Sequence, residues 1–422
     1  MKKIFIFLIC TVTLFAADAT VEIVKRMDKS PVIQVQDASD SSVESELRKK
    51  LFKMLLADLK ITTYYDVNEF YEISSFGNSI GAGYNTNTKT DLILRYKLSE
   101  EIDNSIIATT KLINVKTNNL ISQRSFKISK VDHYPFMSHS IIMSVVKDTK
   151  QEPVDWMDKY VLFAKNTAPG KSEIVIADYT LTFQQTIVKG GLNVFPKWAD
   201  KNQNNFYYTN IGSKKPTVYK VSLMSGQREE IINGEGMLIV SDVSANEKKL
   251  LLTMAPNEQP DIYLYDLETK KLSRVTNYRG VDVGGNFVDN EEKVVFISDR
   301  LGYPNVFSKK INDDRVEQMV YVGRNNSSAS AHKNYIVYSG RDKASEFGDQ
   351  IFNLYLISTQ TNRIRQLTST GKNIFPRFSQ DGGSVLFIKE YAKESALGII
   401  RLGSNKSFHF PINIGKIQSL DW

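Results

Sequence analysis

The stretch Phe195–Trp198 (FPKW) returns further along the chain as Phe375–Phe378 (FPRF), and each copy is followed by a polar turn and an apolar, strand-like run. Weaker copies lie between these two, and a last one closes the chain. The final residues of the copies, which we call the anchors, are Trp198, Val243, Phe287, Ala331, Phe378 and Trp422, spaced 44 to 47 residues apart. A repeat of roughly 40–50 residues is typical of β-propeller blades.

Each repeat carries the pattern of four short strands. After the anchor Phe378 comes the turn Gln380–Gly383 and then the apolar run Val385–Ile388. A third run, such as Asn353–Ile357, and a fourth, such as Ile364–Thr368, lead to the next anchor. Such β-branched and aromatic runs between Gly, Asn and Asp turns predict an all-β array, with the four strands per blade of a propeller.

The first and last strands of this array are predicted to form one blade together. Five full repeats follow Phe195, and three further strands precede it at Tyr160–Ala164, Glu173–Asp178 and Gln184–Val188. We expect the terminal run Ile417–Trp422 to add the fourth strand to these three, because a closed ring leaves no sheet edge exposed. Residues 155–422 are therefore predicted to form six blades.

The residues before the propeller, 20–150, mix strands and helices. Ser41 and Glu44 form an S-x-x-E capping box, which predicts a helix start, and the leucines behind it recur at helical spacing. The other predicted elements are strands at Val32–Val35, Leu92–Tyr96, Ile106–Ile113 and Gln123–Ile128, a helix from Pro135 to Lys147, and a polar linker at Lys147–Asp155. The predicted fold is an α/β N-terminal domain followed by an all-β six-bladed β-propeller.

Residues 1–19 have the pattern of a secretory signal peptide. Lys2 and Lys3 precede the apolar run Ile4–Phe15, which is too short to span a bilayer, and Ala17–Ala19 matches an A-x-A cleavage site. The only cysteine, Cys10, lies inside that run, so the mature chain would carry no disulfide and no thiolate. We expect an exported, periplasmic, monomeric protein.

Composition excludes several classes of function. The formal net charge of +7 is spread thinly, without the lysine and arginine block of a nucleic-acid-binding arm. The chain has four histidines, and none pairs with another at metal-ligand spacing. We therefore expect no nucleic acid, no metal and no cofactor, and we interpret His139 as a structural helix residue.

Two short motifs could suggest catalysis. Gly77–Gly81 (GNSIG) matches the G-x-S-x-G pattern, but a nucleophile elbow needs a strand before the serine and a helix after it, and the residues that follow have loop composition. Gly170–Ser172 (GKS) is similar to the end of a P-loop, but Lys165 stands where the first glycine belongs. We expect a loop and a hairpin turn, and no catalytic residue.

The combination of these features resembles the TolB family of the Tol-Pal envelope system. The likeness is strongest at Phe375–Gly382 (FPRFSQDG), and it is clear at Leu272–Thr276 and Phe296–Phe307. In the first domain it rests on Leu55–Leu59 and Tyr64–Val67. The middle anchors Val243 and Ala331 depart from the pattern because they lack the aromatic residue.

The resemblance implies a scaffold that supports outer-membrane integrity and envelope constriction at cell division. Such proteins bind the peptidoglycan-associated lipoprotein Pal through loops at one mouth of the propeller channel, and the inner-membrane protein TolA through their mature N-terminal segment. Mapped onto this sequence, the mouth residues are Met237, Leu238, Asp282, Val283, Asn325, Asn326, Ser327, Lys372 and Asn373. The N-terminal segment is Thr20, Val21, Glu22, Ile23 and Val24.

Two alternatives belong to other functional classes. A peptidase-like propeller enzyme would need an added hydrolase domain of a few hundred residues, for which we expect no room before Trp422. A propeller that binds a carbohydrate in its channel would need aromatic side chains at the mouth, where Phe195 and Phe375 are the candidates. The scaffold interpretation is favoured over both.

Overall fold

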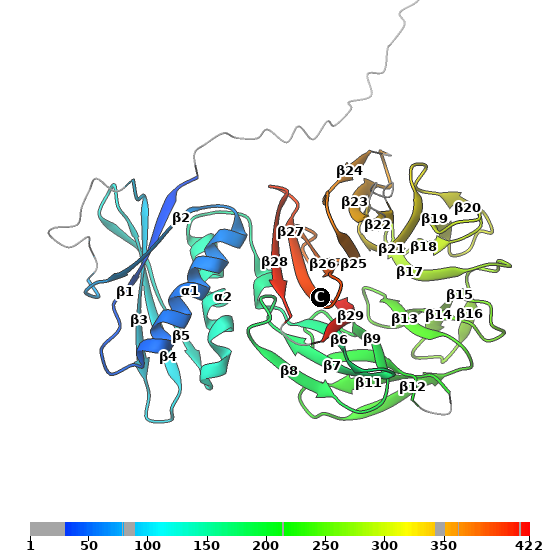
Figure 1. Cartoon of the computed structure of the whole chain (residues 1–422), viewed down its shortest axis with the longest axis horizontal. Helices are drawn as coiled ribbons and strands as arrows, with labels where there is room; N and C mark the ends of the chain where they lie inside the picture. The colour runs from blue at the N-terminus through cyan, green and yellow to red at the C-terminus, as the bar shows by residue number, and fades with distance from the viewer. Residues whose placement is uncertain are drawn as a thin grey trace, which may run out of the picture. The chain divides into compact units, whose positions relative to one another are not determined.

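The computed structural model describes residues 30–77, 79, 89–212, 215–341, 351–361, 363–412 and 415–422. Within it, Pro31–Trp422 forms one compact unit (Figure 1). The predicted signal peptide and the predicted partner segment Thr20–Val24 lie outside the described residues, as do three of the five residues of Gly77–Gly81.

The N-terminal domain is a five-stranded sheet with two helices, in the strand order β2-β1-β3-β4-β5. Strand β1 pairs in parallel with β2 and β3, and the remaining pairs are antiparallel. The elements are β1 (Val32–Asp37), α1 (Ser45–Thr62), β2 (Asp66–Ile73), β3 (Leu92–Glu100), β4 (Ile106–Asn114), β5 (Asn119–Ile128), η1 (Val131–His133) and α2 (Tyr134–Asp148). The predicted strands and the helix near Pro135 are confirmed.

Helix α1 follows the predicted apolar spacing but not the predicted cap. Leu47, Leu51, Leu55 and Leu59 are buried in the core, as the periodicity requires. The capping box is wrong, because the helix begins at Ser45 and its N-cap residue makes no side-chain cap bond. The residues around Ser41 instead form a turn, in which the Val43 N–H donates to the Asp40 carbonyl. A local turn competes here with helix capping.

After the short helix η2 (Asp155–Asp158), all helices and strands assigned in the described residues are β-strands, joined by turns and loops. Three sheets of four strands follow one another. The first consists of β9 (Asn193–Trp198), β10 (Asn205–Asn210), β11 (Thr217–Ser222) and β12 (Arg228–Asn233), and the second of β13 (Leu238–Val243), β14 (Lys249–Met254), β15 (Asp261–Asp266) and β16 (Leu272–Arg274). The third consists of β17 (Asp282–Val288), β18 (Lys293–Ser298), β19 (Asn305–Lys310) and β20 (Val316–Gln318).

The next eight strands form one larger sheet, because a single residue pair, Phe352 with Lys372, joins two groups of four. The first group is β21 (Arg324–His332), β22 (Tyr335–Arg341), β23 (Phe352–Ser358) and β24 (Ile364–Gln366). The second group is β25 (Lys372–Phe378), β26 (Ser384–Glu390), β27 (Ser395–Arg401) and β28 (Lys406–Pro411).

The last strand of the chain joins the first strands of the propeller. Strand β29 (Lys416–Asp421) pairs antiparallel with β6 (Val161–Ala168), which continues into β7 (Lys171–Ala177) and β8 (Gln184–Val188). Figure 1 shows β29, in red, beside the green strand β6. This is the expected pairing of the two ends. Counting each group of four strands as one blade, we infer six blades.

The innermost strand of each blade contains a bulge that the sequence pattern did not indicate. The pairing register with the second strand shifts in all six innermost strands, β9, β13, β17, β21, β25 and β29. Three residues before the anchor, Phe195, Gly284, Ser328 and Phe375 have φ between 50° and 66°. A left-handed residue of this kind bends a strand without ending it.

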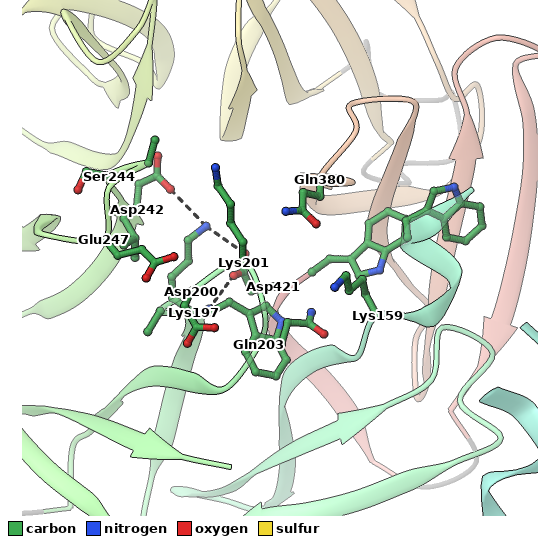
Figure 2. A pocket seen from close by; sticks show the side chains of 16 residues that line it. Lys159, Lys197, Asp200, Lys201, Gln203, Asp242, Ser244, Glu247, Gln380 and Asp421 are labelled. Atoms are coloured by element: carbon green, nitrogen blue, oxygen red, sulfur yellow. Dashed lines mark hydrogen bonds and ion pairs between the residues drawn. The ribbon is translucent and has the colours of Figure 1, made fainter. Parts of the chain in front are cut away.

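Just before several of the anchors, side chains connect one blade to the next. The Asp421 carboxylate accepts the backbone N–H of Trp198 (2.9 Å), and the Asp242 carboxylate accepts that of Phe287 (2.9 Å). Lys197 lies between these two carboxylates, with its Nζ 3.1 Å from Asp421 and 3.4 Å from Asp242 (Figure 2). The innermost strands therefore run in the same direction and finish at the same end of the propeller.

A buried polar network links the N-terminal domain to the propeller. His139 on α2 lies between Asp58 of α1 (Nδ1–Oδ2 2.9 Å) and Asp178, which follows β7 (Nε2–Oδ2 3.4 Å). Asp58 also accepts hydrogen bonds from Ser138 (2.6 Å) and from the Tyr179 hydroxyl. All five side chains are fully buried. The structural role expected for His139 fits this position.

Burial lowers the pKa of His139, but the attraction of Asp58 and hydrogen bonds to both carboxylates outweigh it and raise the pKa from 6.5 to about 9. The imidazolium therefore stabilises the fold fully below pH 6.5, and this contribution is lost as the pH rises through about 9. For His139→Gln we expect the free energy of unfolding to lose this pH dependence, worth about 3 kcal/mol in the parent protein. Denaturant titrations at pH 6.5 and pH 10 measure it; an equal pH dependence in both proteins would contradict it.

Truncation after Lys416 tests ring closure. It removes most of β29, including the buried Ile417 and Leu420. Losing two such side chains should reduce the free energy of unfolding by at least about 5 kcal/mol, measured by chemical denaturation. The substitution Lys416→Ala, on a partly exposed side chain, is the matched control. A truncated protein that unfolds at the same denaturant concentration as the full chain would show that β29 does not close the ring.

Candidate partner-binding site

The propeller has two different ends, which we name by the direction of the innermost strands. At the start face these strands begin, and at the end face they finish at the anchors. Because each innermost strand is antiparallel to the second strand, the loop after the second strand also lies at the start face. Leu238 pairs with Met254, for example, and Lys372 pairs with Glu390.

Large apolar side chains are exposed in the loops of the start face. They precede innermost strands or follow second strands, and they are Ile211, Met237, Val281, Leu301, Tyr321, Val322 and Tyr391. Tyr321 is 72% exposed and Val322 is 58% exposed. Single exposed apolar residues are ordinary, but several in the loops of one face are typical of a protein-binding surface.

The structure corrects the predicted position of the mouth residues. They were expected in loops, but eight of the nine lie in innermost strands: Leu238 in β13, Asp282 and Val283 in β17, Asn325, Asn326 and Ser327 in β21, and Lys372 and Asn373 in β25. Only Met237 lies in a loop, and it is 44% exposed. The bulge explains the error, because each innermost strand begins several residues before the bulged position.

Four of the predicted mouth residues are buried, namely Leu238, Asp282, Asn326 and Asn373, and the two asparagines donate hydrogen bonds there. The Asn373 side-chain amide donates to the carbonyls of Phe352 (2.9 Å) and Thr370 (3.0 Å). The Asn326 amide donates to the Asn305 side chain (3.0 Å). Asn325, Ser327 and Val283 are half-buried, and Lys372 forms an ion pair with Glu390 (2.7 Å). These groups lie in the innermost strands at the start face, whereas the exposed apolar side chains lie in its loops.

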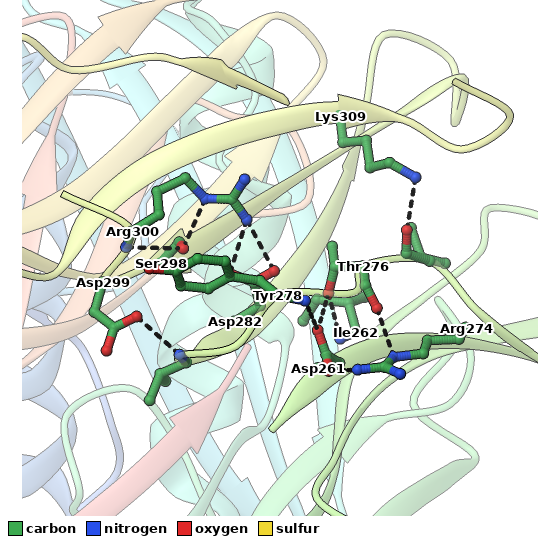
Figure 3. A network of polar contacts seen from close by, with 12 residues as sticks. Asp261, Ile262, Arg274, Thr276, Tyr278, Asp282, Ser298, Asp299, Arg300 and Lys309 are labelled. Carbon is green, nitrogen blue, oxygen red and sulfur yellow. Dashed lines mark hydrogen bonds and ion pairs between the residues drawn. The ribbon is translucent and has the colours of Figure 1, made fainter. Parts of the chain in front are cut away.

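Asp282 holds one of these loops in place (Figure 3). Its carboxylate is fully buried, and both oxygens accept hydrogen bonds from Arg300 Nη2 at 3.0 Å. Arg300 Nε donates to Ser298 Oγ (2.9 Å), and the guanidinium lies 4.9 Å from the centre of the Tyr278 ring. This arginine fixes the loop that carries Leu301 against the loop that carries Val281.

A second set of side-chain hydrogen bonds recurs in two of the blades. Asp261, the first residue of β15, accepts hydrogen bonds from Arg274 and from Thr276 Oγ1 (3.0 Å; Figure 3). In the sheet of β21–β24, Asn353 accepts the equivalent bond from Thr368 Oγ1 (3.1 Å). In these two blades, the threonine two residues after the fourth strand therefore ties it to the third strand, whereas Val320 occupies this position in the blade of β17–β20. The repeated threonine was visible in the sequence, but its partner was not.

The described residues offer no catalytic arrangement. Gly77 and Ser79 present their backbone carbonyls to Arg95 (2.7 and 3.2 Å), as a loop does. No group of three metal-ligating side chains is found in the part of the chain that the structure describes. No helix among these residues is long and apolar enough to cross a membrane.

Comparison with known proteins agrees with this architecture. The family profile described as TolB beta propeller domain matches residues 157–422. The chain is 46% identical to the Tol-Pal system protein TolB of Wolinella succinogenes, over 97% of each chain. It is 43% identical to the Tol-Pal system protein TolB of Campylobacter jejuni, over the full length of both.

A solved structure gives an independent view of the fold. The crystal structure of TolB from Acinetobacter baumannii superimposes with a TM-score of 0.74, covering 93% of this chain and 97% of that one. The two sequences are 19% identical, so this likeness concerns the fold alone. It agrees with the predicted order of an α/β domain followed by a β-propeller.

Asp282→Ala tests whether Asp282 stabilises the folded start face and does not itself contact a partner. We expect the free energy of unfolding to fall by about 3 kcal/mol, because the substitution leaves Arg300 without its buried partner. Met237→Ser, in an exposed loop, should change it by less than about 0.5 kcal/mol. Chemical denaturation measures both. Equal stability of the two variants would contradict the assignment of Asp282 to the scaffold.

Proposed function

Because the chain belongs to the TolB family of Tol-Pal system proteins, we propose that it works in the periplasm as a scaffold between two envelope proteins. It is a component of the Tol-Pal system rather than an enzyme. Its start face would bind the peptidoglycan-associated lipoprotein Pal, and its N-terminal segment would bind TolA. Through these contacts it would support outer-membrane integrity and constriction of the envelope at division.

The observation that carries the first half of this proposal is the set of exposed apolar side chains on the start face. Leaving Tyr321, Val322 and Met237 in water costs free energy that a partner could recover by covering them. Tyrosine and methionine are enriched in protein interfaces, and the residues that dominate binding cluster near the centre of an interface. The buried braces beneath keep these loops ordered before binding.

The second half rests on the sequence of Thr20–Val24. This short β-branched segment would follow the predicted signal peptide, at the mature N-terminus. A free strand of this kind can bind by adding to the sheet edge of another protein. The two partner sites would therefore lie on different parts of the chain and be separable by mutation.

The first prediction concerns the lipoprotein. We expect Met237→Asp or Val322→Asp to weaken its binding at least tenfold, because a carboxylate would be buried at an apolar contact. Met224→Asp is a matched control, since Met224 is equally apolar and 96% exposed but follows β11, away from the start face. Binding titrations with the purified soluble domain of the lipoprotein measure the effect. Equal losses for Met224→Asp and Met237→Asp would sink the assignment of the surface.

The second prediction concerns the N-terminal segment. Deletion of Thr20–Val24 should abolish TolA binding and leave lipoprotein binding unchanged or strengthened. Strengthened lipoprotein binding would mean that the two sites are coupled, typically by about 1–3 kcal/mol. Ser79→Ala should change neither interaction. The same titrations, run with each partner in turn, give the answer. Loss of the same partner from the tail deletion and from Met237→Asp would contradict a two-site scaffold.

A further inference from the structure

A cleft of about 390 Å³ lies on the start face, where the first strands of the propeller meet its last strand. It is lined by residues 166–171, Leu192, Lys393, Gly415 and Lys416. Three of the lining residues are lysines, Lys171, Lys393 and Lys416, and none of these described lining residues is Asp or Glu. We call this the lysine cleft.

The three lysines come from separate segments that meet at the cleft. Lys171 follows the tight turn between β6 and β7, the segment Gly170–Ser172 that was predicted to be a hairpin turn. Lys416 is the first residue of β29, and its Nζ donates to the carbonyl of Ala392 (3.0 Å). That bond holds the loop of Lys393, between β26 and β27, against the start of β29.

The ammonium groups of the lysine cleft are only partly balanced by carboxylates. The side chains of Lys171 and Lys393 are exposed and form no ion pair within the residues that the structure describes. Lys416 Nζ lies 3.8 Å from the Glu390 carboxylate, but Lys372 Nζ lies closer to the same carboxylate, at 2.7 Å. One glutamate is therefore shared by two lysines, and two further lysines have no carboxylate partner.

The neighbouring residues leave this excess of positive charge in place. Lys189 is exposed in the loop after β8, whose Gly191 carbonyl accepts a backbone hydrogen bond from the start of β7 (3.1 Å). Lys165 and Glu173 lie opposite each other on β6 and β7, so their charges offset each other. Glu394 is exposed beside the cleft and offsets one more charge. Six lysines against three glutamates leave a net charge of +3 around the cleft.

The exposure of these lysines decides which kind of anion fits. Ammonium groups gathered in this way repel one another, and a negatively charged partner relieves the repulsion. A small anion is held best by donors in a fixed concave geometry, whereas Lys171 and Lys393 carry their charges on flexible, exposed side chains. Such lysines suit the carboxylates on the surface of another protein. Tyr391, which is 47% exposed and two residues before Lys393, joins the cleft to the apolar side chains of the start face.

We propose that the lysine cleft binds an acidic segment of the lipoprotein, with Asp or Glu carboxylates placed against Lys171 and Lys393. This inference rests on the proposed function, because it names the chemistry of the surface that the lipoprotein would present to this part of the start face. Charge pairs that stay accessible to water mainly speed association and make it depend on salt, and they change the lifetime of a complex less.

The double substitution Lys171→Glu with Lys393→Glu tests the cleft. We expect the association rate constant with the purified soluble domain of the lipoprotein to fall at least about tenfold at low salt, and the dissociation rate constant to change by less than about threefold. In about 1 M salt the difference from the parent protein should nearly disappear. Stopped-flow mixing with the full-length mature protein measures both rate constants.

The matched control is Lys201→Glu with Lys271→Glu, which makes the same change in net charge. Both of these lysines are exposed at the end face, in the loops after β9 and after β15. Both rate constants of this variant should stay close to those of the parent protein. Equal slowing of the two double variants would overturn the proposal, because net charge and not the cleft would then set the rate.

The remaining outcomes separate the cleft from the proposed function. If Met237→Asp weakens binding as expected but the cleft variant associates as fast as the parent protein, the cleft proposal fails and the proposed function stands. If the parent protein does not bind the lipoprotein, both fail. Vesicles of phosphatidylglycerol test a lipid partner. Binding to them by the parent protein but not by the cleft variant, with unchanged lipoprotein association, would overturn the proposal in favour of a membrane surface.

Discussion

The contact on which the propeller depends is the one that Asp421 makes near the end of the chain. Its carboxylate accepts the backbone N–H of Trp198 and lies within ion-pair distance of Lys197 and Arg377, so one side chain joins three innermost strands. Asp242 makes the equivalent bond to Phe287. Since each sheet contacts its neighbours mainly through apolar faces, these directional bonds fix the register between blades that burial alone would leave loose.

The repeat in the sequence revealed this arrangement only in part. The anchors are visible because apolar and aromatic residues return at a fixed period, and that period predicted the strands and the pairing of β29 with β6. The residues just before the anchors are basic at Lys197 and Arg377, acidic at Asp242 and Asp421, and neutral at Asn286 and Ser330, so no one type returns in every repeat. A repeat search detects the residue types that the blades share, whereas the hydrogen bonds and ion pairs between blades use residues that differ from blade to blade.

The prediction assigned the mouth residues to loops, but the structure places eight of the nine in the innermost strands at the start face. Counting back from the anchors missed the bulge, which lengthens each innermost strand and moves its first residue earlier. Phe195 and Phe375 adopt left-handed φ values that phenylalanine rarely takes, so no residue preference could have shown the bulge. The exposed Tyr321 and Val322 could have been found, as apolar residues next to Gly323 just before a strand.

The joint between the domains limits how the two proposed partner sites can influence each other. One apolar core includes Leu55 and Ile141 of the N-terminal helices together with Leu397 and Leu420 of the propeller. The predicted polar linker, Lys147–Asp155, includes Val154 and leads into Trp156, and both of these side chains are buried in that same core. Domains joined by a large apolar interface do not move freely. Coupling between the sites must therefore pass through the propeller sheets or the N-terminal segment itself, not through a hinge at residues 147–155.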